Sequence, residues 1–338
     1  MPHLLKWVRI AAMPRTPALL SLLHATVAVA MTAVAAPQHV GALRTAAAAP
    51  GHASTSRPNA GGARQATQPC PQCVEMNKPH GPFRIYGNTY FVGTNGLSSI
   101  LIVSDQGHIL IDGDLPESAP QIVTNIVALG FRLMDVKLIL NSHDHHDHAG
   151  GIAELQRKTG AKVAASRASA KVMGQGHSDP DDPQFGLAPA YPAVRNVQTI
   201  KDGETLKVGP NSITAHFTPG HTPGGTTWTW KACEKSRCRL IVYADSLTAV
   251  SAEGFLFSNS KTYPNAVEDF HKSFTVLKTL PCDILLTPHP GASDMWPRLD
   301  QASRTGSTES WVDPTACQRF AETAETNLNK RLADEVRR

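Results

Sequence analysis

Acidic residues are absent from the first 69 positions of this sequence, and no long apolar run occurs after position 35. A transmembrane helix needs about 20 consecutive apolar residues, so nothing after position 35 predicts one. The first 69 residues hold six basic side chains, so the formal charge of +4 falls to −2 without them. A nearly neutral chain with no basic stripe argues against nucleic-acid binding.

The first 35 residues have the pattern of a secretory signal peptide. A basic start without acids precedes an apolar stretch at 18–31, and the small residues Ala33-Val34-Ala35 follow it. This order predicts export, with cleavage after Ala35. The stretch is only moderately apolar, which argues against a stable membrane anchor. We therefore expect a periplasmic protein. Translation can start at Met1 or at Met13, because the chain from Met13 keeps the same pattern.

Residues 36–69 consist mostly of Ala, Gly, Ser, Thr and Pro, with few large apolar side chains. A segment of this composition cannot bury enough apolar surface to fold. We therefore predict a signal peptide at 1–35, a disordered linker at 36–69 and one domain at 70–338.

Strand-like and helix-like patterns alternate in two halves of the chain, on either side of an irregular loop at 177–183. The first half has strand patterns at 90–92, 99–103, 108–111 and 136–140, and helical patterns at 119–129 and 152–159. The second half has strand patterns at 213–217, 226–231, 240–243 and 284–286, and a final helical pattern at 317–338. This order predicts an α/β (α+β) fold of two mixed β-sheets packed face to face, with helices on the outer faces.

The most informative motif is the run His143-Asp144-His145-His146-Asp147-His148. It follows the apolar strand pattern at 136–140, so it lies at the carboxyl end of a buried strand, where open α/β sheets bind ligands. Imidazole and carboxylate are ligands that zinc prefers. A solvated His-rich loop that binds metal weakly is the alternative. We set it aside because burying so many ionisable groups without a metal is costly.

The spacing within the run indicates which of its residues can bind a first metal, which can bind a second metal, and which point away from both. His143 and His145 are two residues apart and can point the same way from an extended chain. Asp147 and His148 lie where the chain turns and can face a second metal. Asp144 and His146 are predicted to point away from the ligand face, because their side chains alternate with those of the ligands.

Two more histidines follow strand patterns at turns rich in proline and glycine. His221 lies in Thr218-Pro219-Gly220-His221-Thr222-Pro223-Gly224, and His289 lies in Thr287-Pro288-His289-Pro290-Gly291. Three strand ends that each carry histidine are hard to explain as structural residues alone. His216, which alternates within a strand pattern, is predicted to be structural.

Together these motifs resemble the metallo-β-lactamase superfamily, and in detail its subclass B3. The resemblance rests on the His143-x-His145-x-Asp147-His148 run, the Gly-His-Thr-Pro-Gly turn at His221, the strand end Tyr243-Ala244-Asp245-Ser246, and the Pro-His-Pro-Gly turn at His289. It spans residues 70–320. It implies an αβ/βα four-layer sandwich with the metal site along the edge where the sheets meet.

The resemblance also implies two Zn²⁺ ions. His143, His145 and His221 would bind the first ion and leave one position open for water. Asp147, His148 and His289 would bind the second ion. Asp147 would also orient the attacking water, which makes it the predicted catalytic residue.

Substrate-binding residues are expected at the strand end that follows Asp245. Ser246 and Thr248 project to the same side, and their hydroxyls can hold a substrate carboxylate. Ordinary turn hydroxyls are the alternative. In many hydrolases of the superfamily an Asp at this position bridges the metals, whereas in subclass B3 the adjacent Ser takes its place. We follow the second pattern, and a bridging Asp245 stays open.

The predicted function is zinc-dependent hydrolysis of the β-lactam amide bond, which confers β-lactam resistance, by a monomer that binds only small-molecule substrates. Another hydrolase of the same fold is the alternative, either a thioesterase of the glyoxalase II type or a lactonase, and a bridging Asp245 would favour it. A third hypothesis is that the chain is an exported protein that binds zinc but has no enzymatic activity. The sequence does not rank penicillins, cephalosporins and carbapenems as substrates.

The six cysteines fit an oxidising compartment. The resemblance implies a disulfide between Cys282 and Cys317. Cys233 and Cys238 bracket a polar hairpin tip, where a local disulfide is plausible. Cys70 and Cys73 form a C-x-x-C pair, which we interpret as a structural disulfide or a loosely held pair, because a zinc site of cysteines would need two more nearby.

Overall fold

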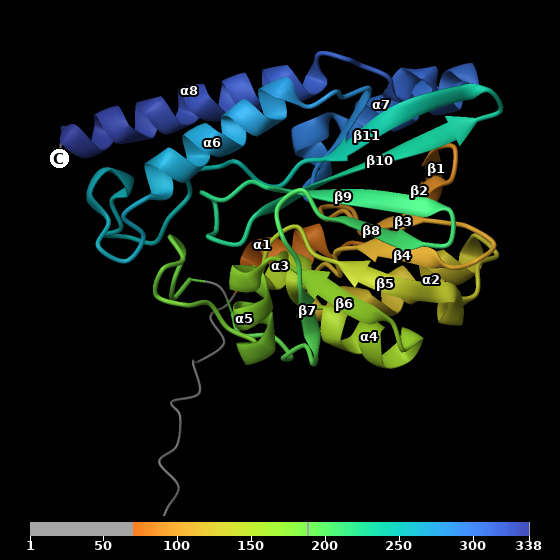
Figure 1. Ribbon diagram of the computed structural model, residues 1–338, viewed down its shortest axis with the longest axis horizontal. Helices are drawn as coiled ribbons and strands as arrows, with labels where there is room; N and C mark the ends of the chain where they lie inside the picture. Colours follow the sequence, from red (N-terminus) through yellow and green to blue (C-terminus); the bar gives the residue numbers. More distant parts are fainter. Residues whose placement is uncertain (1–69, 188, 338) are drawn as a thin grey trace, which may run out of the picture. The chain divides into compact units, whose positions relative to one another are not determined.

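The computed structural model describes residues 70–187 and 189–337. Figure 1 shows their arrangement. The predicted signal peptide at 1–35 and linker at 36–69 lie outside the described residues. Within them, no helix is both long and apolar enough to cross a membrane.

The first half of the chain forms a mixed sheet of seven strands in the order β1-β2-β3-β4-β5-β6-β7. Strands β1 to β4 are antiparallel neighbours, and β4 to β7 are parallel neighbours. The bounds of its strands are β1 Phe83–Tyr86, β2 Thr89–Phe91, β3 Ile100–Ile102, β4 His108–Ile111, β5 Val136–Leu140, β6 Lys162–Ala165 and β7 Val197–Thr199.

The second half forms a mixed sheet of five strands in the order β12-β11-β10-β9-β8. Only β11 and β12 are parallel neighbours in this sheet. The bounds of its strands are β8 Thr205–Val208, β9 Asn211–Phe217, β10 Thr226–Glu234, β11 Arg237–Tyr243 and β12 Ile284–Leu286.

Helices connect the strands and cover the outer faces of both sheets. The α-helices are α1 Pro71–Met76, α2 Ala119–Ala128, α3 His146–Ala149, α4 Ile152–Thr159, α5 Arg167–Gln175, α6 Ala266–Thr279, α7 Met295–Thr305 and α8 Ala316–Val336. Short 3-10 helices lie at Pro116–Ser118, Leu133–Asp135, Phe257–Asn259, Pro290–Ser293 and Thr308–Trp311. In Figure 1, α2, α4 and α5 lie outside the first sheet, and α6 and α8 lie outside the second.

Strand alternation explains why both faces of the first sheet are buried. In β3, Ile100 and Ile102 belong to the core between the two sheets, whereas Leu101 packs in the core under α2 and α4. In β5, Leu138 and Leu140 face the first of these cores and Ile139 faces the second. Nearly continuous apolar strands are expected when helices and a second sheet cover opposite faces.

A third core lies between the second sheet and its helices. It joins Val242 of β11 and Leu285 of β12 to Phe270 and Phe274 of α6 and Leu328 of α8. The three cores separate four layers: helices, sheet, sheet and helices. The predicted αβ/βα sandwich of two mixed sheets is therefore confirmed.

The described cysteines form three disulfides, Cys70–Cys73, Cys233–Cys238 and Cys282–Cys317. Cys233 and Cys238 are paired neighbours at the end of the β10–β11 hairpin, as the polar tip indicated. Cys282 precedes β12 and Cys317 lies in α8, so their disulfide ties the last helix to the sheet. The predicted disulfides are confirmed.

Candidate metal centre

The loop at the carboxyl end of β5 carries the histidine-rich run, and a buried carboxylate holds this loop in place. Asp112 Oδ1 accepts hydrogen bonds from the main-chain N–H of Ser142 at 2.7 Å and from Asn141 Nδ2 at 3.1 Å. Asp112 Oδ2 accepts from Ser142 Oγ at 2.7 Å and from Tyr243 Oη at 2.8 Å. Burial raises the pKa of Asp112 to about 7 against these hydrogen bonds. Because Tyr243 belongs to β11, the loop is anchored to both sheets.

The chain turns sharply after this loop. His145 has an extended backbone conformation, and the short helix α3 begins at His146. Gly151 separates α3 from α4, and a Cβ atom there would collide with the main-chain oxygen of Gly113. The glycine therefore allows α4 to pack against the segment that follows β4, which sets the direction of the turn.

Three buried histidines form a first group of donor atoms, which we call triad 1: His143, His145 and His221. Their ring nitrogens lie within 4.8 Å of one another, and the centroids of each pair of rings are 4.9 Å apart. The loop after β5 supplies two of these residues, and the turn after β9 supplies the third. The structure thus brings together side chains from both sheets.

Each ring of triad 1 has one nitrogen occupied by a partner outside the triad. His143 Nδ1 lies 2.8 Å from Asp245 Oδ1, and His145 Nε2 lies 3.0 Å from Asp182 Oδ2. His221 Nδ1 donates to the main-chain oxygen of Thr248 at 2.8 Å. Carboxylate and carbonyl partners of this kind orient histidines that bind metals.

A zinc ion fits the nitrogens that remain. His143 Nε2 is buried, and no polar atom of the described residues pairs with it. The free nitrogen of His221 lies 3.5 Å from Gln184 Nε2, at the limit of a hydrogen bond. Three imidazole nitrogens that face one point and leave a fourth side open match a zinc site that keeps a position for water.

The pKa values of triad 1 differ with the partners of each ring. Burial, with a smaller effect of the neighbouring histidines, lowers the pKa of His143 well below its ordinary value. Burial and the nearby His145 lower the pKa of His221 to about 4. Burial also opposes protonation of His145, but the Asp182 carboxylate overcomes it and raises the pKa to about 9. Since neutral imidazole binds metal, His145 must lose a proton on loading.

A second group of donor atoms, which we call triad 2, consists of Asp147, His148 and His289. His148 Nε2 and His289 Nε2 are 3.3 Å apart, and Asp147 Oδ2 lies 3.4 Å from the first and 3.6 Å from the second. The ring centroids of His143 and His148 are 4.3 Å apart, so the two triads are adjacent.

The protonation states of triad 2 also suit a cation. Burial raises the pKa of Asp147, but the neighbouring His148 and His289 outweigh this effect and hold it well below its usual range. Burial lowers the pKa of His148 well below its ordinary value. An ionised carboxylate and a neutral imidazole are the forms that bind a metal.

Both triads open into one pocket of about 360 Å³. This volume lies in the range of small-molecule sites, about 300–1,000 Å³. Beyond the six triad residues, its walls come from α1 and the residue before it, from α3, from the loop after α5 and from the strand end after β11: Cys70, Gln72, Met76, His146, Gln184, Leu187, Pro189, Thr248 and Val250. The site is therefore an open cleft and not a sealed structural metal site.

The predicted substrate residues occupy different environments. Thr248 lines the pocket, whereas Ser246 is 8% exposed and is not among the lining residues. Asp245 lies behind His143 and belongs to neither triad. Its position is that of a residue that orients a ligand, because its Oδ1 meets the ring nitrogen that points away from the triad.

The sequence predicts that the side chain of His146 points away from the ligand face, and this prediction is wrong. Its side chain lines the pocket, and its Nε2 lies 3.3 Å from Cys73 Sγ. Alternation applies only to an extended chain, and α3 begins at this residue. Asp144, which precedes the helix, belongs to neither triad, as expected.

The sequence pattern does not identify Asp182 and Gln184 as site residues. Both lie in the irregular segment after α5, where Asp182 reaches His145 and Gln184 reaches His221. The only signal was the cluster of acids at 179–182, which we interpreted as a loop between halves.

Comparisons with known proteins agree with this geometry. A family model described as the metallo-β-lactamase superfamily matches residues 92–232. The solved structure of the Rm3 metallo-β-lactamase is 54% identical, with a TM-score of 0.77, and the match covers 79% of this chain and 99% of that chain. MEM-A1, a subclass B3 metallo-β-lactamase isolated from a soil metagenome library, is 50% identical, with a TM-score of 0.76 and coverage of 77% and 98%.

Curated relatives match a smaller region. A hydroxyacylglutathione hydrolase of Bradyrhizobium sp. (strain BTAi1 / ATCC BAA-1182) is 31% identical over 173 residues, which cover 51% of this chain and 54% of that protein. This chain therefore spans about half the length of that relative. The two metallo-β-lactamase structures are similar over more of the chain and at higher identity.

Proposed function

The chain belongs to the metallo-β-lactamase superfamily, and from this premise we propose that it hydrolyses the amide bond of β-lactams with two zinc ions. The observation that carries the proposal is the complete donor set at the floor of an open pocket. Six donors lie in two adjacent groups, and every ring of triad 1 is oriented by a partner. The high similarity to two metallo-β-lactamase structures, over 98–99% of their length, supports the substrate class.

We assign His143, His145 and His221 to one zinc ion and Asp147, His148 and His289 to the other. When bound, zinc lowers the pKa of water to about 7 and polarises a carbonyl. His143, His221 and His148 are held neutral and Asp147 is held ionised, which are the forms that bind a metal, whereas His145 loses its proton when the ion enters. The carboxylate of Asp147 lies beside His148 and His289 and can accept a hydrogen bond from the attacking water, which orients it toward the carbonyl.

Substrate recognition is proposed for the strand end after β11. Thr248 lines the pocket, and its hydroxyl, whose oxygen lies 3.2 Å from His221 Nδ1, can donate to the carboxylate that β-lactams carry beside the scissile amide. Ser246 lies deeper on the same segment and is the second proposed substrate residue. Leu187 and Val250, each 50% exposed at the pocket wall, offer apolar contact to the substituents of the substrate.

Hydrolysis of a chromogenic cephalosporin by the purified chain tests the proposal. We expect turnover that a chelator abolishes and added zinc restores. His221→Ala should remove activity, whereas His216→Ala should keep it, because His216 is a strand residue bonded to Thr229 and lies outside both triads. No turnover of any β-lactam by zinc-loaded protein would contradict the proposal.

A thioester hydrolase is the second candidate, favoured by the match to a hydroxyacylglutathione hydrolase. The position of Asp245 weighs against it, because a bridging Asp would have to face both triads, whereas this carboxylate faces His143 Nδ1. A hydroxyacylglutathione thioester offered to the same preparation separates the two candidates. Turnover of the thioester with no turnover of β-lactams would assign the chain to the second.

We also propose a periplasmic location. Three disulfides in the described residues favour an oxidising compartment, and the first 35 residues have the pattern of a signal peptide. Expression of the full chain in a susceptible Gram-negative host should raise β-lactam resistance. A chain that starts near residue 36 should protect poorly, and equal protection by both would contradict this location.

A further inference from the structure

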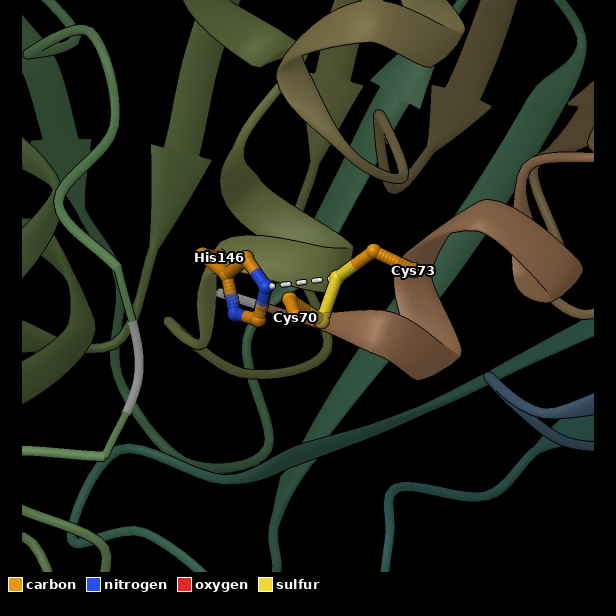
Figure 2. A group of neighbouring side chains, drawn as sticks. All are labelled: Cys70, Cys73 and His146. Carbon is orange, nitrogen blue, oxygen red and sulfur yellow. Dashed lines mark hydrogen bonds between the residues drawn. A yellow bond between two sulfur atoms is a disulfide. The ribbon is translucent and has the colours of Figure 1, made fainter. Parts of the chain in front are cut away.

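A third cluster of metal-binding side chains lies at the wall of the pocket, beside the two triads. Cys70, Cys73 and His146 place their sulfur and nitrogen atoms within 4.8 Å of one another. Figure 2 shows the imidazole of His146 directed at the Cys70–Cys73 disulfide, with the hydrogen bond from Nε2 to Cys73 Sγ at 3.3 Å. Neither cysteine belongs to triad 1 or triad 2.

From this juxtaposition we propose a redox-gated third zinc site, formed by Cys70, Cys73 and His146 once their disulfide is reduced. Two thiolates and one imidazole, with water in the fourth position, are a known zinc donor set. The disulfide form has no thiolate and cannot bind the ion. Reduction is therefore the gate.

The reaction that opens the site is thiol–disulfide exchange. A dithiol reductant gives two electrons and two protons to the Cys70–Cys73 bond, so that two thiols form and the reductant becomes a disulfide. Zinc binding then releases the two thiol protons. The C-x-x-C spacing encloses a very short loop, so by chain entropy this disulfide contributes less to stability than one that closes a long loop.

Other contacts hold α1 in place when the disulfide is absent. Thr94 Oγ1 donates to the main-chain oxygen of Met76 at 2.8 Å, and the N–H of Gly96 donates to the same oxygen at 2.9 Å. The side chain of Cys73 is 6% exposed and packs with Leu97 and Leu115. These contacts keep Cys73 close to His146 after reduction.

A zinc ion at this site would adjoin the metal centre. Cys70 and His146 line the same pocket as the two triads. Binding through His146 Nε2 requires the ring proton to be on Nδ1, which lies 3.7 Å from Asp147 Oδ1. Among the described residues this Nδ1 has no hydrogen-bond partner. Occupancy of the third site would therefore alter the surroundings of Asp147 without displacing a donor of either triad.

Metal counting on the full chain tests the inference. Protein reduced with a water-soluble phosphine and then freed of it should bind one more zinc than the oxidised protein. Cobalt substitution should add a thiolate-to-metal charge-transfer band in the near ultraviolet, because the triads contain no sulfur. His146→Ala should weaken binding of the additional ion by roughly tenfold or more.

Two matched variants control for the other cysteines. Cys70→Ser with Cys73→Ser should lose the additional ion and the band but keep the metal of the triads, which also shows that the variant folds. Cys233→Ser with Cys238→Ser should keep both. Equal zinc content before and after reduction, a band that survives Cys70→Ser with Cys73→Ser, or binding unaffected by His146→Ala would overturn the inference. None of these measurements depends on β-lactam turnover.

Discussion

The two triads differ in how firmly their donors are held. In triad 1 all three rings are buried, and each has its second nitrogen occupied by Asp245, Asp182 or the main-chain oxygen of Thr248. A ring that is fixed before the metal arrives loses little freedom when it binds. The donors of triad 1 are therefore the more firmly oriented of the two groups.

Triad 2 is held more loosely. The side chain of His289 is 43% exposed, and its Nδ1 has a contact of 3.3 Å with the main-chain oxygen of Gly96. His148 Nδ1 is buried, and no hydrogen-bond partner is found for it among the described residues. The donors of triad 2 come from a four-residue helix and a turn. This contrast predicts one firmly held zinc ion and one that leaves more readily.

The largest effect is expected at Asp147. Asp147→Ala removes a donor of triad 2 and the carboxylate that we propose orients the attacking water, so kcat should fall by roughly 10² or more. Steady-state kinetics on zinc-replete protein measure this. Asp105→Ala, at an exposed turn, is the control and should leave kcat unchanged. A small effect of Asp147→Ala would mean that triad 2 does not take part in the reaction.

Stepwise removal of zinc tests the contrast directly. The zinc-replete chain should contain two ions, and a graded chelator should remove one before the other. His289→Ala should leave one ion that resists the chelator, because triad 1 is intact. Elemental analysis and activity measured on the same samples give the order. At most one ion under replete conditions, or simultaneous loss of both, would contradict the two-site reading.

The partners of triad 1 are expected to affect zinc affinity more than kcat. Asp182→Asn and Asp245→Asn keep the size of each side chain but replace the carboxyl group that meets His145 or His143 with an amide. Loss of such a partner costs roughly 10–100-fold in metal affinity. Competition with a chromogenic chelator measures it. Asp181→Asn, at a neighbouring residue that bonds to no histidine of triad 1, is the control. Unchanged affinity would mean that burial alone holds the rings.

The pair of His145 and Asp182 makes the thermal stability of the zinc-free protein depend on pH. His145 has a pKa raised from 6.5 to about 9 beside Asp182. A folded-state pKa above the ordinary value stabilises the fold fully below about pH 6.5, and this contribution is lost as the pH rises through about 9. Chelated wild type should therefore unfold at a higher temperature than chelated Asp182→Asn at pH 6. The difference should shrink by pH 9.5. A difference that does not change with pH would contradict the ion pair.

The sequence divides the six predicted donors into the same two groups that the structure brings together, but it does not reveal their hydrogen-bond partners. Each donor lies in a short motif at the end of a strand pattern, so His221 and His289 can be recognised from local spacing alone. Asp182 cannot, because its role depends on an irregular segment that returns to His145 only in the folded chain. His146 was misassigned because the start of α3 changes the direction of successive side chains.

The smallest effects are expected from substitutions at the strand end after β11. These variants distinguish residues that bind the substrate from residues that hold triad 1 in place. Thr248→Ala should raise KM. The loss of binding free energy should be at most about 1.5–3 kcal/mol, the value of one charge-assisted hydrogen bond. Its zinc content should not change, because the main-chain oxygen that accepts from His221 remains. Ser246→Ala should raise KM less, since Ser246 is buried away from the pocket wall. Kinetics with a penicillin, a cephalosporin and a carbapenem, together with zinc analysis, measure both variants. Loss of zinc from Thr248→Ala would mean that the hydroxyl holds His221, and a larger KM change in Ser246→Ala would reverse the assignment of the carboxylate-binding residue.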